Sequence, residues 1–447
     1  MGQGHMKAEI ICNKCTVSVI AFFILFLFCS FGFASFMVSV NNTSQLSIVT
    51  KYGTPTAVCL TSITSSASKV QRFVQTSHKE LPSSLIGISW ETISSFTVIP
   101  SALGAVNGID LIEEYALITA RLLHDIGIDF IYGIPITGDS KYSLASSSFK
   151  SALLVSIFIR AFRAYGMLSV IKGFPISLDE PPLSHLTISK SAFENSILVA
   201  FRALKTRTHI DAIDLEPVYL DFLDSKNPVV SSETVKKYVY HEIEEDTIFV
   251  MNGKGLSDKQ CEELSEKGLV NIEYSRYISI HSRVKKGGEE FKVLSGAVSY
   301  GKKIFGNVRD DIKELNEMVK KINIASITLV KQGYVVSRPE HIYICDIKHP
   351  PSIKDYNVKS VRYDELSTIN LGNKDVLIFF VRSKDEFERI TAFMGKKNVI
   401  LVTLYPLTIE HLNEVNSVIL VYDVSHSVID KIVQITKGEF HPSGTKP

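Results

Sequence analysis

Short apolar runs alternate with longer amphipathic stretches along most of the chain, and this alternation limits the possible folds more than any other feature. Six runs have the length and composition of buried strands: Ala57–Leu60, Leu85–Ile88, Phe130–Ile136, Leu168–Lys172, Ala212–Leu215 and Thr247–Met251. Helical stretches lie between them, such as Leu111–Ile126, Ser148–Tyr165 and Lys190–Thr206. Repeated β-α units predict a parallel sheet, and this number of units predicts a TIM-type (β/α)8 barrel.

A second, smaller α/β unit is expected after the barrel, beginning between about Lys331 and Glu340. Its expected strands are Ile342–Cys345, Asp375–Val381, Asn398–Thr403 and Ser417–Tyr422. Helices such as Lys384–Met394 and Val428–Ile435 complete a doubly wound domain. Before it, residues 285–290 (K-K-G-G-E-E) predict a loop and Asp310–Lys321 predicts a charged helix.

The N-terminal region carries a membrane signal. Residues 16–50 contain no charge, and Val17–Val40 is almost wholly apolar and rich in Phe. About 20 apolar residues span a bilayer as a helix. Lys7 and Lys14 precede the run and no basic residue follows until Lys51, so the positive-inside rule places the body of the protein outside the cytosol. We expect a cytoplasmic tail (1–15), a transmembrane anchor (16–40), the barrel (41–330) and the second domain (331–447).

Two alternatives to the anchor remain. Gly32-Phe33-Ala34 fits the cleavage site of a signal peptide, and the run also fits a buried core helix. We favour an uncleaved, single-pass anchor in the cell membrane because the apolar run continues past Ala34.

Composition and cysteine spacing argue against several classes of function. The 48 Lys+Arg nearly cancel the 47 Asp+Glu, whereas a nucleic-acid binder would show a basic excess. Cys12 and Cys15 form a C-x-x-C without a second pair, so we expect no metal site. The sequence contains no phosphate-binding loop and no G-x-G-x-x-G after a strand, and we expect no cofactor.

Seven stretches follow one another in the order and spacing of one set of motifs. They are Leu85–Glu91, Ile99–Ala105, Arg121–Phe130, Val170–His185, Asn227–Ser232, Ser326–Lys331 and Gly438–Gly444. They resemble the motifs of glycoside hydrolase family 3, especially its β-N-acetylglucosaminidase branch. Among those motifs are I-D-x-E-G-G, K-H-F-P-G-H-G-D-x-x-x-D-S-H, S-I-T-L-L-K and a terminal G-x-x-x-P-S-G. The resemblance covers roughly residues 57–447 and implies a barrel followed by an α/β domain.

The resemblance also implies a retaining mechanism, which needs a carboxylate nucleophile and a proton donor. The family's nucleophile is the first Asp of V-S-D-D-L, and here the strand reads I-F-V-M-N-G-K, which puts Asn252 and Gly253 at the two acidic positions. An amide cannot form the glycosyl ester. The D-S-H of the proton donor reads Leu183-Ser184-His185, so His185 is retained and its carboxylate partner is replaced by Leu183.

Most positions that bind sugar in the family are also changed. The substitutions fall at Ser89, Thr92-Ile93, Thr137, Tyr142 and Gly173. Glu91 and Lys172 are retained, and Lys141 lies beside the position of a family arginine. We take these three as candidate substrate-binding residues.

Each retained residue also has a purely structural interpretation. Lys172 could be a solvated lysine at the barrel mouth, and Glu91 could cap a helix. His185 could be a solvated loop histidine, and Asn252-Gly253 could form a turn. Glu216 follows a predicted strand on the same side as Asp214, at the strand end where barrel active sites lie. It is a weak candidate for a displaced carboxylate, and a salt-bridged rim is the alternative.

We therefore expect a catalytically inactive homologue that binds a glycan, another cell-envelope component or a protein partner outside the membrane without cleaving it, and the sequence does not identify the partner. The alternative is an active β-glycosidase that hydrolyses N-acetylglucosamine-containing glycans with a relocated carboxylate. A third hypothesis is a structural envelope protein whose barrel mouth is filled by Trp90, Ile93 and Leu183.

Overall fold

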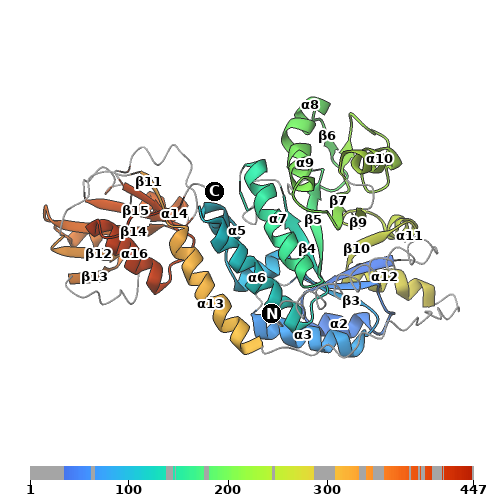
Figure 1. Cartoon of the computed structure of the whole chain (residues 1–447), viewed down its shortest axis with the longest axis horizontal. Helices are drawn as coiled ribbons and strands as arrows, with labels where there is room; N and C mark the ends of the chain where they lie inside the picture. The colour runs from blue at the N-terminus through green and yellow to red at the C-terminus, as the bar shows by residue number, and fades with distance from the viewer. Residues whose placement is uncertain are drawn as a thin grey trace, which may run out of the picture. The chain divides into compact units, whose positions relative to one another are not determined.

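The computed structural model divides the chain into two compact units (Figure 1). The residues it describes are 35–61, 66–136, 144–145, 147–175, 181–243, 247–285, 308–331, 339–345, 357–381, 384–390, 393, 398–404, 415 and 417–444. Unit 1 comprises residues up to Thr97 and Glu113–Asn316, and unit 2 comprises Val98–Ile112 and Glu317–Pro447. Unit 2 thus begins at Glu317 instead of 331 and includes a segment from within the expected barrel range.

Unit 1 is a closed barrel of eight parallel strands, which confirms the predicted (β/α)8 class. The strands follow the order β1-β10-β9-β7-β5-β4-β3-β2 around the barrel. Their bounds are β1 Ser35–Val40, β2 Ala57–Leu60, β3 Leu85–Ser89, β4 Phe130–Pro135, β5 Leu168–Phe174, β7 Ala212–Leu215, β9 Ile248–Asn252 and β10 Leu269–Glu273. All six strands expected in this unit are present. β1 and β10 complete the ring.

Helices connect the strands on the outside of the barrel (Figure 1). They are α2 Thr43–Val49, α3 Ala67–Glu80, α4 Trp90–Phe96, α6 Ile109–Ile126, α7 Ser148–Ala164, α8 Lys190–Phe193, α9 Val199–Lys205, α10 Glu233–Glu242 and α11 Asp258–Ser265. α12 (Tyr274–Lys285) follows the last barrel strand, and α13 (Val308–Ala325) runs from unit 1 into unit 2. The helix expected over Lys190–Thr206 is interrupted by a π-helical turn at Glu194–Leu198. A two-stranded parallel sheet, β6 His185–Leu186 and β8 Tyr219–Leu220, lies outside the barrel.

The barrel interior is filled by alternate side chains of the strands. One buried cluster contains Met37, Ala57, Cys59, Phe130, Tyr132, Val170, Ala212, Val250 and Leu269. Gly87 is required beside Phe130, because a Cβ at residue 87 would come within 2.2 Å of that ring. At the carboxyl ends of the strands, the residues that face the barrel interior are polar instead of apolar. The polar candidate residues therefore lie next to the apolar core.

The expected anchor over 16–40 is wrong at its C-terminal end, because Ser35–Val40 forms β1 and pairs with both β2 and β10. A parallel barrel strand is buried on both faces and reads as a continuous apolar run, so it merges in the sequence with the apolar stretch before it. The barrel begins at Ser35 instead of 41. Residues 16–34, and with them the rest of the anchor, lie outside the described residues. Within the described ranges, no helix is both long and apolar enough to cross a membrane.

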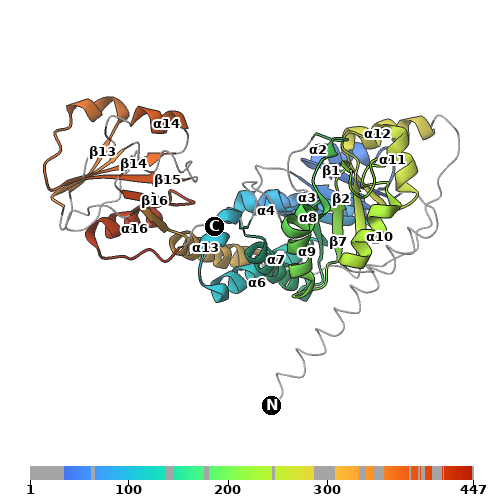
Figure 2. The same cartoon turned by 90° about the horizontal axis from the view of Figure 1, so that it is seen from above.

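Unit 2 is a six-stranded sheet in the order β11-β16-β15-β14-β12-β13. Its strands are β11 Thr328–Lys331, β12 His341–Cys345, β13 Asn357–Val361, β14 Asp375–Val381, β15 Val399–Thr403 and β16 Ser417–Leu420. α16 (His426–Lys437) packs on one face and α14 (Lys384–Arg389) on the other, as Figure 2 shows. This confirms the doubly wound prediction. α5 (Pro100–Ala105) also belongs to this unit.

The two motifs of unit 2 that resemble family 3 lie against each other. Gly444 donates from its N–H to the carbonyl of Ile327 at 3.1 Å. A Cβ at residue 444 would come within 2.5 Å of the carbonyl oxygen of Ser326. The chain end therefore needs glycine where it crosses the start of β11.

Candidate functional site

Four partly buried side chains gather where barrel strands end, and we call them the mouth cluster: Glu91, Lys172, Glu216 and Asn252. Lys172 lies near the end of β5, Asn252 is the last residue of β9, Glu216 follows β7, and Glu91 lies in the first turn of α4, which begins directly after β3. Carboxyl ends of parallel barrel strands meet at one face, which is where barrel active sites lie. The structure thus brings together four of the residues singled out in the sequence.

Lys172 and Glu91 form an ion pair, with Nζ 3.6 Å from Oε1. Burial pulls the pKa of Lys172 down, but Glu91, Glu216 and Asp214 more than offset it, and its pKa is raised. The ammonium therefore remains charged in a site dominated by carboxylates. Such a pair offers both donors and acceptors to the hydroxyl groups of a sugar.

Asn252 forms hydrogen bonds with Glu216 and with the backbone of Lys254. Its Nδ2 donates to Oε2 of Glu216 at 3.1 Å, and its Oδ1 accepts from the N–H of Lys254 at 3.0 Å. A carboxylate oxygen thus lies one hydrogen-bond length from the side chain at the expected nucleophile position. Glu216, the weak sequence candidate for a displaced carboxylate, therefore lies next to Asn252.

A chain of hydrogen bonds crosses the barrel interior beside the mouth cluster. Ser39 Oγ donates to Asn271 Oδ1 at 2.9 Å, Asn271 Nδ2 donates to Tyr132 Oη at 2.8 Å, and Tyr132 donates to Asp214 Oδ2 at 2.7 Å. Burial, followed by the charge of Glu216, raises the pKa of Asp214 well above its usual range. Burial and Asp214 raise the pKa of Tyr132 in the same way. Asp214 Oδ1 has no hydrogen-bond partner among the described residues, so Asp214 is a buried acid held close to Glu216.

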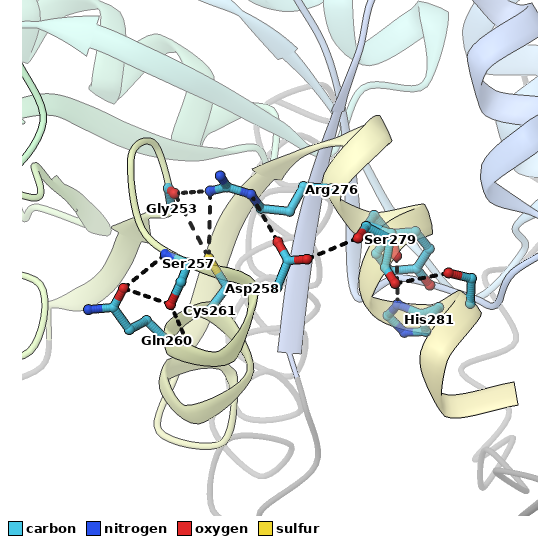
Figure 3. A network of polar contacts seen from close by, with 10 residues as sticks. Gly253, Ser257, Asp258, Gln260, Cys261, Arg276, Ser279 and His281 are labelled. Atoms are coloured by element: carbon cyan, nitrogen blue, oxygen red, sulfur yellow. Dashed lines mark hydrogen bonds and ion pairs between the residues drawn. The ribbon is translucent and has the colours of Figure 1, made fainter. Parts of the chain in front are cut away.

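The turn that follows Asn252 is fixed by a polar network (Figure 3). Arg276 of α12 donates to the carbonyl of Gly253, and its Nε lies 3.5 Å from Oδ1 of Asp258. Ser279 donates to the other oxygen of Asp258 at 2.9 Å. Gly253 itself admits no side chain, because a Cβ there would come within 2.7 Å of Ile272. The Ile272 side chain and the Asn271 carbonyl of β10 therefore fill the space that a side chain at the position of the family's second Asp would need.

His185 is paired with a carboxylate that the sequence did not indicate. Its Nδ1 lies 2.7 Å from Oδ1 of Asp221, and its ring stacks on Tyr219 at 4.3 Å between centroids and 4° between planes. The expectation that His185 lacks a carboxylate partner is therefore wrong. Asp221 is 36 residues further along the chain, so no local motif could identify it.

Of the three apolar residues expected to fill the barrel mouth, Trp90 packs against an outer helix. Trp90 is buried and packs edge-to-face on Phe158 of α7, with centroids 5.0 Å apart. Ile93 is buried on the same helix α4. Leu183 is half-buried in the left-handed region at φ 62°. The Trp90 contact takes that ring towards the outer helices, which removes the main support for a plugged, purely structural barrel.

Some candidate residues from the sequence lie outside the described residues, and others lie within them. Lys141, Thr137 and Tyr142 lie outside the described residues, as do Cys12 and Cys15. Cys59, Cys261 and Cys345 are buried free thiols. No group of three or more His, Cys, Asp or Glu in the described part of the chain is arranged to hold a metal ion.

Comparisons with known proteins give a match in structure alone. No family model matches the sequence, and no curated protein matches it. A family 3 β-N-acetylglucosaminidase from a Paenibacillus species is 15% identical with a TM-score of 0.66, over 92% of this chain and 97% of that chain. A β-glucoside phosphorylase is 13% identical with a TM-score of 0.67, over 97% and 96%. An exo-1,3/1,4-β-glucanase from a Pseudoalteromonas species is 10% identical with a TM-score of 0.64, over 92% and 87%.

These similarities establish the fold. The chain has the two-part architecture of glycoside hydrolase family 3 enzymes, a parallel barrel followed by a doubly wound α/β domain. A fold does not by itself fix an activity, so the chemistry has to be argued from the mouth cluster and from His185.

Proposed function

We propose that this protein cleaves β-linked glycans at the carboxyl end of its barrel, with Glu216 supplying the carboxylate that residue 252 lacks. The observation that carries the proposal is the 3.1 Å contact between Asn252 Nδ2 and Glu216 Oε2. The amide of Asn252 cannot act as a nucleophile, but it holds an oxygen that can. The sequence alone favours an inactive protein, and this contact is the reason for preferring the active alternative.

The substrate class follows from the site and from the resemblance. Lys172 and Glu91 supply charged donors and acceptors for hydroxyl groups. The loop that ends at His185 resembles that of the β-N-acetylglucosaminidase branch. We therefore propose N-acetylglucosamine-containing β-glycans as substrates, with no cofactor.

Hydrolysis of chromogenic β-glycosides by the full chain in detergent tests this function. We expect turnover of the N-acetylglucosaminide, and loss of at least 10³-fold in Glu216→Gln, because the amide removes the nucleophile while keeping the size of the side chain. The matched control is Glu194→Gln, a half-buried acid of the π-helical turn that pairs with Lys190 and accepts a hydrogen bond from Tyr238. Equal turnover of Glu216→Gln and the wild-type protein would exclude Glu216.

The second candidate is a protein that binds glycans without cleaving them. It is supported by the amide at residue 252 together with the altered sugar-binding positions at Ser89 and Thr92. This candidate predicts no wild-type turnover, glycan binding by calorimetry, and a gain of turnover in Asn252→Asp. Each sample needs a mass check for deamidation at Asn252-Gly253, because that reaction would create an Asp in the wild-type protein.

We also propose that the protein works outside the cytosol, at the cell envelope. Residues 16–34 are uncharged, apolar and preceded by Lys7 and Lys14. Since Ser35–Val40 belongs to β1, the run beyond Ala34 no longer favours an anchor over a cleaved signal peptide. The mass of the purified protein distinguishes the two, since cleavage would give an N-terminus at Ser35. Recovery of the uncut chain in the soluble cytosolic fraction would contradict both.

A further inference from the structure

We infer that Asp221 is the positioning residue for His185, and that the pair forms the proton donor of the site. This inference rests on the proposed hydrolysis. It adds a second relocated carboxylate to the first, because the loop Leu183–His185 carries no acid of its own. Asp221 reaches the histidine from a different segment of the chain.

The side-chain geometry fits an oriented imidazole. Asp221 Oδ1 lies 2.7 Å from Nδ1 of His185, the distance of a charge-assisted hydrogen bond. Tyr219 stacks flat on the imidazole and fixes the plane of the ring. A carboxylate that accepts the Nδ1 proton sets the tautomer and leaves Nε2 for the ligand. Two contacts thus define both the plane and the rotation of the ring.

Backbone pairing keeps the two partners together. β6 and β8 pair in parallel with His185 opposite Tyr219. The N–H of Leu183 donates to the carbonyl of Pro217 at 2.6 Å, and the N–H of Tyr219 donates to the carbonyl of Ser184 at 2.9 Å. These two bonds fasten the residues directly before His185 to the segment that bears Asp221, and the β6–β8 pairing, which aligns Leu186 with Leu220, holds the residue after it.

The pair is exposed enough for orientation to be its main contribution. The side chain of His185 is 53% exposed and that of Asp221 31%. Exposed ion pairs add little to stability because water screens them. The pair therefore contributes mainly to the orientation of the His185 ring and little to the free energy of unfolding.

One short segment supplies both relocated carboxylates. Glu216 directly follows β7, and Asp221, five residues further along, directly follows β8. The first contacts Asn252, at the expected nucleophile position, and the second contacts His185, at the expected proton-donor position. The loss of two motif acids is thus matched by two acids from the Glu216–Asp221 segment.

The chemical step balances with these groups. Protonated His185 gives its Nε2 proton to the glycosidic oxygen as the C1–O bond breaks, and the bonding pair leaves with that oxygen. A carboxylate oxygen of Glu216 bonds to C1 and forms a glycosyl ester. Water then attacks C1, its proton passes to Nε2, and the Glu216 carboxylate is released. The net reaction adds one water across the glycosidic bond.

The test compares substrates whose leaving groups differ in their need for a proton. In the full chain, Asp221→Asn should lower kcat/KM for a methyl β-N-acetylglucosaminide about 10- to 100-fold, which is part of the roughly 10²- to 10⁴-fold that general acid catalysis supplies. The kcat/KM for the dinitrophenyl glycoside, whose leaving group needs no proton, should change less than about twofold. His185→Gln should show the same pattern. Asp224→Asn is the matched control, since Asp224 lies in the same turn and bonds to Ser232 instead.

Two kinetic results would overturn the inference, and so would one spectroscopic result. Equal slowing of both substrates by Asp221→Asn would mean that Asp221 is only structural, and no slowing of either would mean that His185 does not need it. A second readout is independent of activity: ¹⁵N shifts of the His185 ring should report the Nδ1–H tautomer in the wild-type protein and a mixture in Asp221→Asn. An unchanged tautomer would contradict the positioning role. Absence of wild-type turnover on both substrates would instead contradict the proposed hydrolysis.

Discussion

Asn252 donates a hydrogen bond from Nδ2 to Oε2 of Glu216 over 3.1 Å, and its own Oδ1 is held by the N–H of Lys254. The amide is therefore oriented from both ends. A carboxylate at residue 252 would place a second negative charge beside Glu216, whereas the amide supplies a donor to it. The Asn at this position is consistent with a change of role from reacting group to holder of Glu216.

Removing the holder should weaken the proposed activity without abolishing it. We expect Asn252→Ala to lower kcat for the N-acetylglucosaminide about 10- to 100-fold, because misplacing a reacting group by about 1 Å costs about that much. KM should change little. Asn227→Ala, whose amide contacts Asp224 in an exposed turn, is the control. Unchanged kcat in Asn252→Ala would show that Glu216 does not depend on this hydrogen bond.

Lys172 should contribute to glycan affinity. In a Glu216→Gln background, which prevents turnover, Lys172→Met should weaken binding of a chitin oligosaccharide about 10-fold or more, since hydrogen bonds to charged groups contribute about 1.5–3 kcal/mol. Isothermal titration calorimetry measures the effect. Lys190→Met removes the exposed partner of an ion pair with Glu194 and should leave affinity within about twofold. Equal losses in both variants would place the ligand away from the mouth cluster.

Asp214 should make the protein less stable as the pH rises. Burial and Glu216 raise its native pKa well above the value of about 3.9 in an unfolded chain. Between those two values the native state holds a proton that the unfolded state has released, so the free energy of unfolding falls with rising pH. Asp214→Asn keeps an acceptor for Tyr132 and removes the titration. Urea denaturation should find it more stable than the wild-type protein at pH 7, with the difference gone below about pH 4.

Asp224 provides a control of opposite sign. The hydrogen bond from Ser232 lowers its pKa to about 2. Its contribution to stability is present above the unfolded value of about 3.9 and is lost as the pH falls towards about 2. Asp224→Asn should therefore be less stable than the wild-type protein at pH 7 and equal to it near pH 2. The same sign for both variants would contradict the interpretation of Asp214.

The Arg276 network should support both stability and the turn after Asn252. Arg276→Met leaves the Gly253 carbonyl and the Asp258 carboxylate without this donor, and should lower the free energy of unfolding by about 1–3 kcal/mol. Lys259→Met on neighbouring α11 breaks only an exposed pair with Glu263 and should cost less than about 0.5 kcal/mol. Chemical denaturation measures both. A loss below 0.5 kcal/mol in Arg276→Met would show that the network adds little.

The barrel could be predicted where apolar residues recur with the different periods of strands and helices. The strands that the sequence analysis missed lack such a pattern. β1 merged with the apolar N-terminal run, because a strand buried on both faces has no polar positions to mark it. β10 (L-V-N-I-E) carries Asn271, whose polar side chain points into the barrel where an apolar one is expected. β13 is an edge strand with mostly exposed, polar residues, which resemble a loop in sequence.

The site was predictable only where a motif is continuous along the chain. Asn252, Lys172 and Glu91 occupy positions within recognisable motifs, and the structure brings them together with Glu216. The partnership of His185 with Asp221 depends on the pairing of β6 with β8, which no local pattern reports. Trp90 was misplaced for a related reason, because its neighbour Phe158 comes from a helix much further along the chain.

The most direct test of the central claim is to trap the reacting carboxylate. The full chain is incubated with a fluorinated N-acetylglucosaminyl fluoride, which slows hydrolysis of a glycosyl ester, and is then digested and analysed by mass spectrometry. The proposed function predicts one sugar adduct on the peptide that contains Glu216, and none in Glu216→Gln. Turnover with an adduct on another residue, or no adduct and no turnover in the wild-type protein, would contradict the role assigned to Glu216.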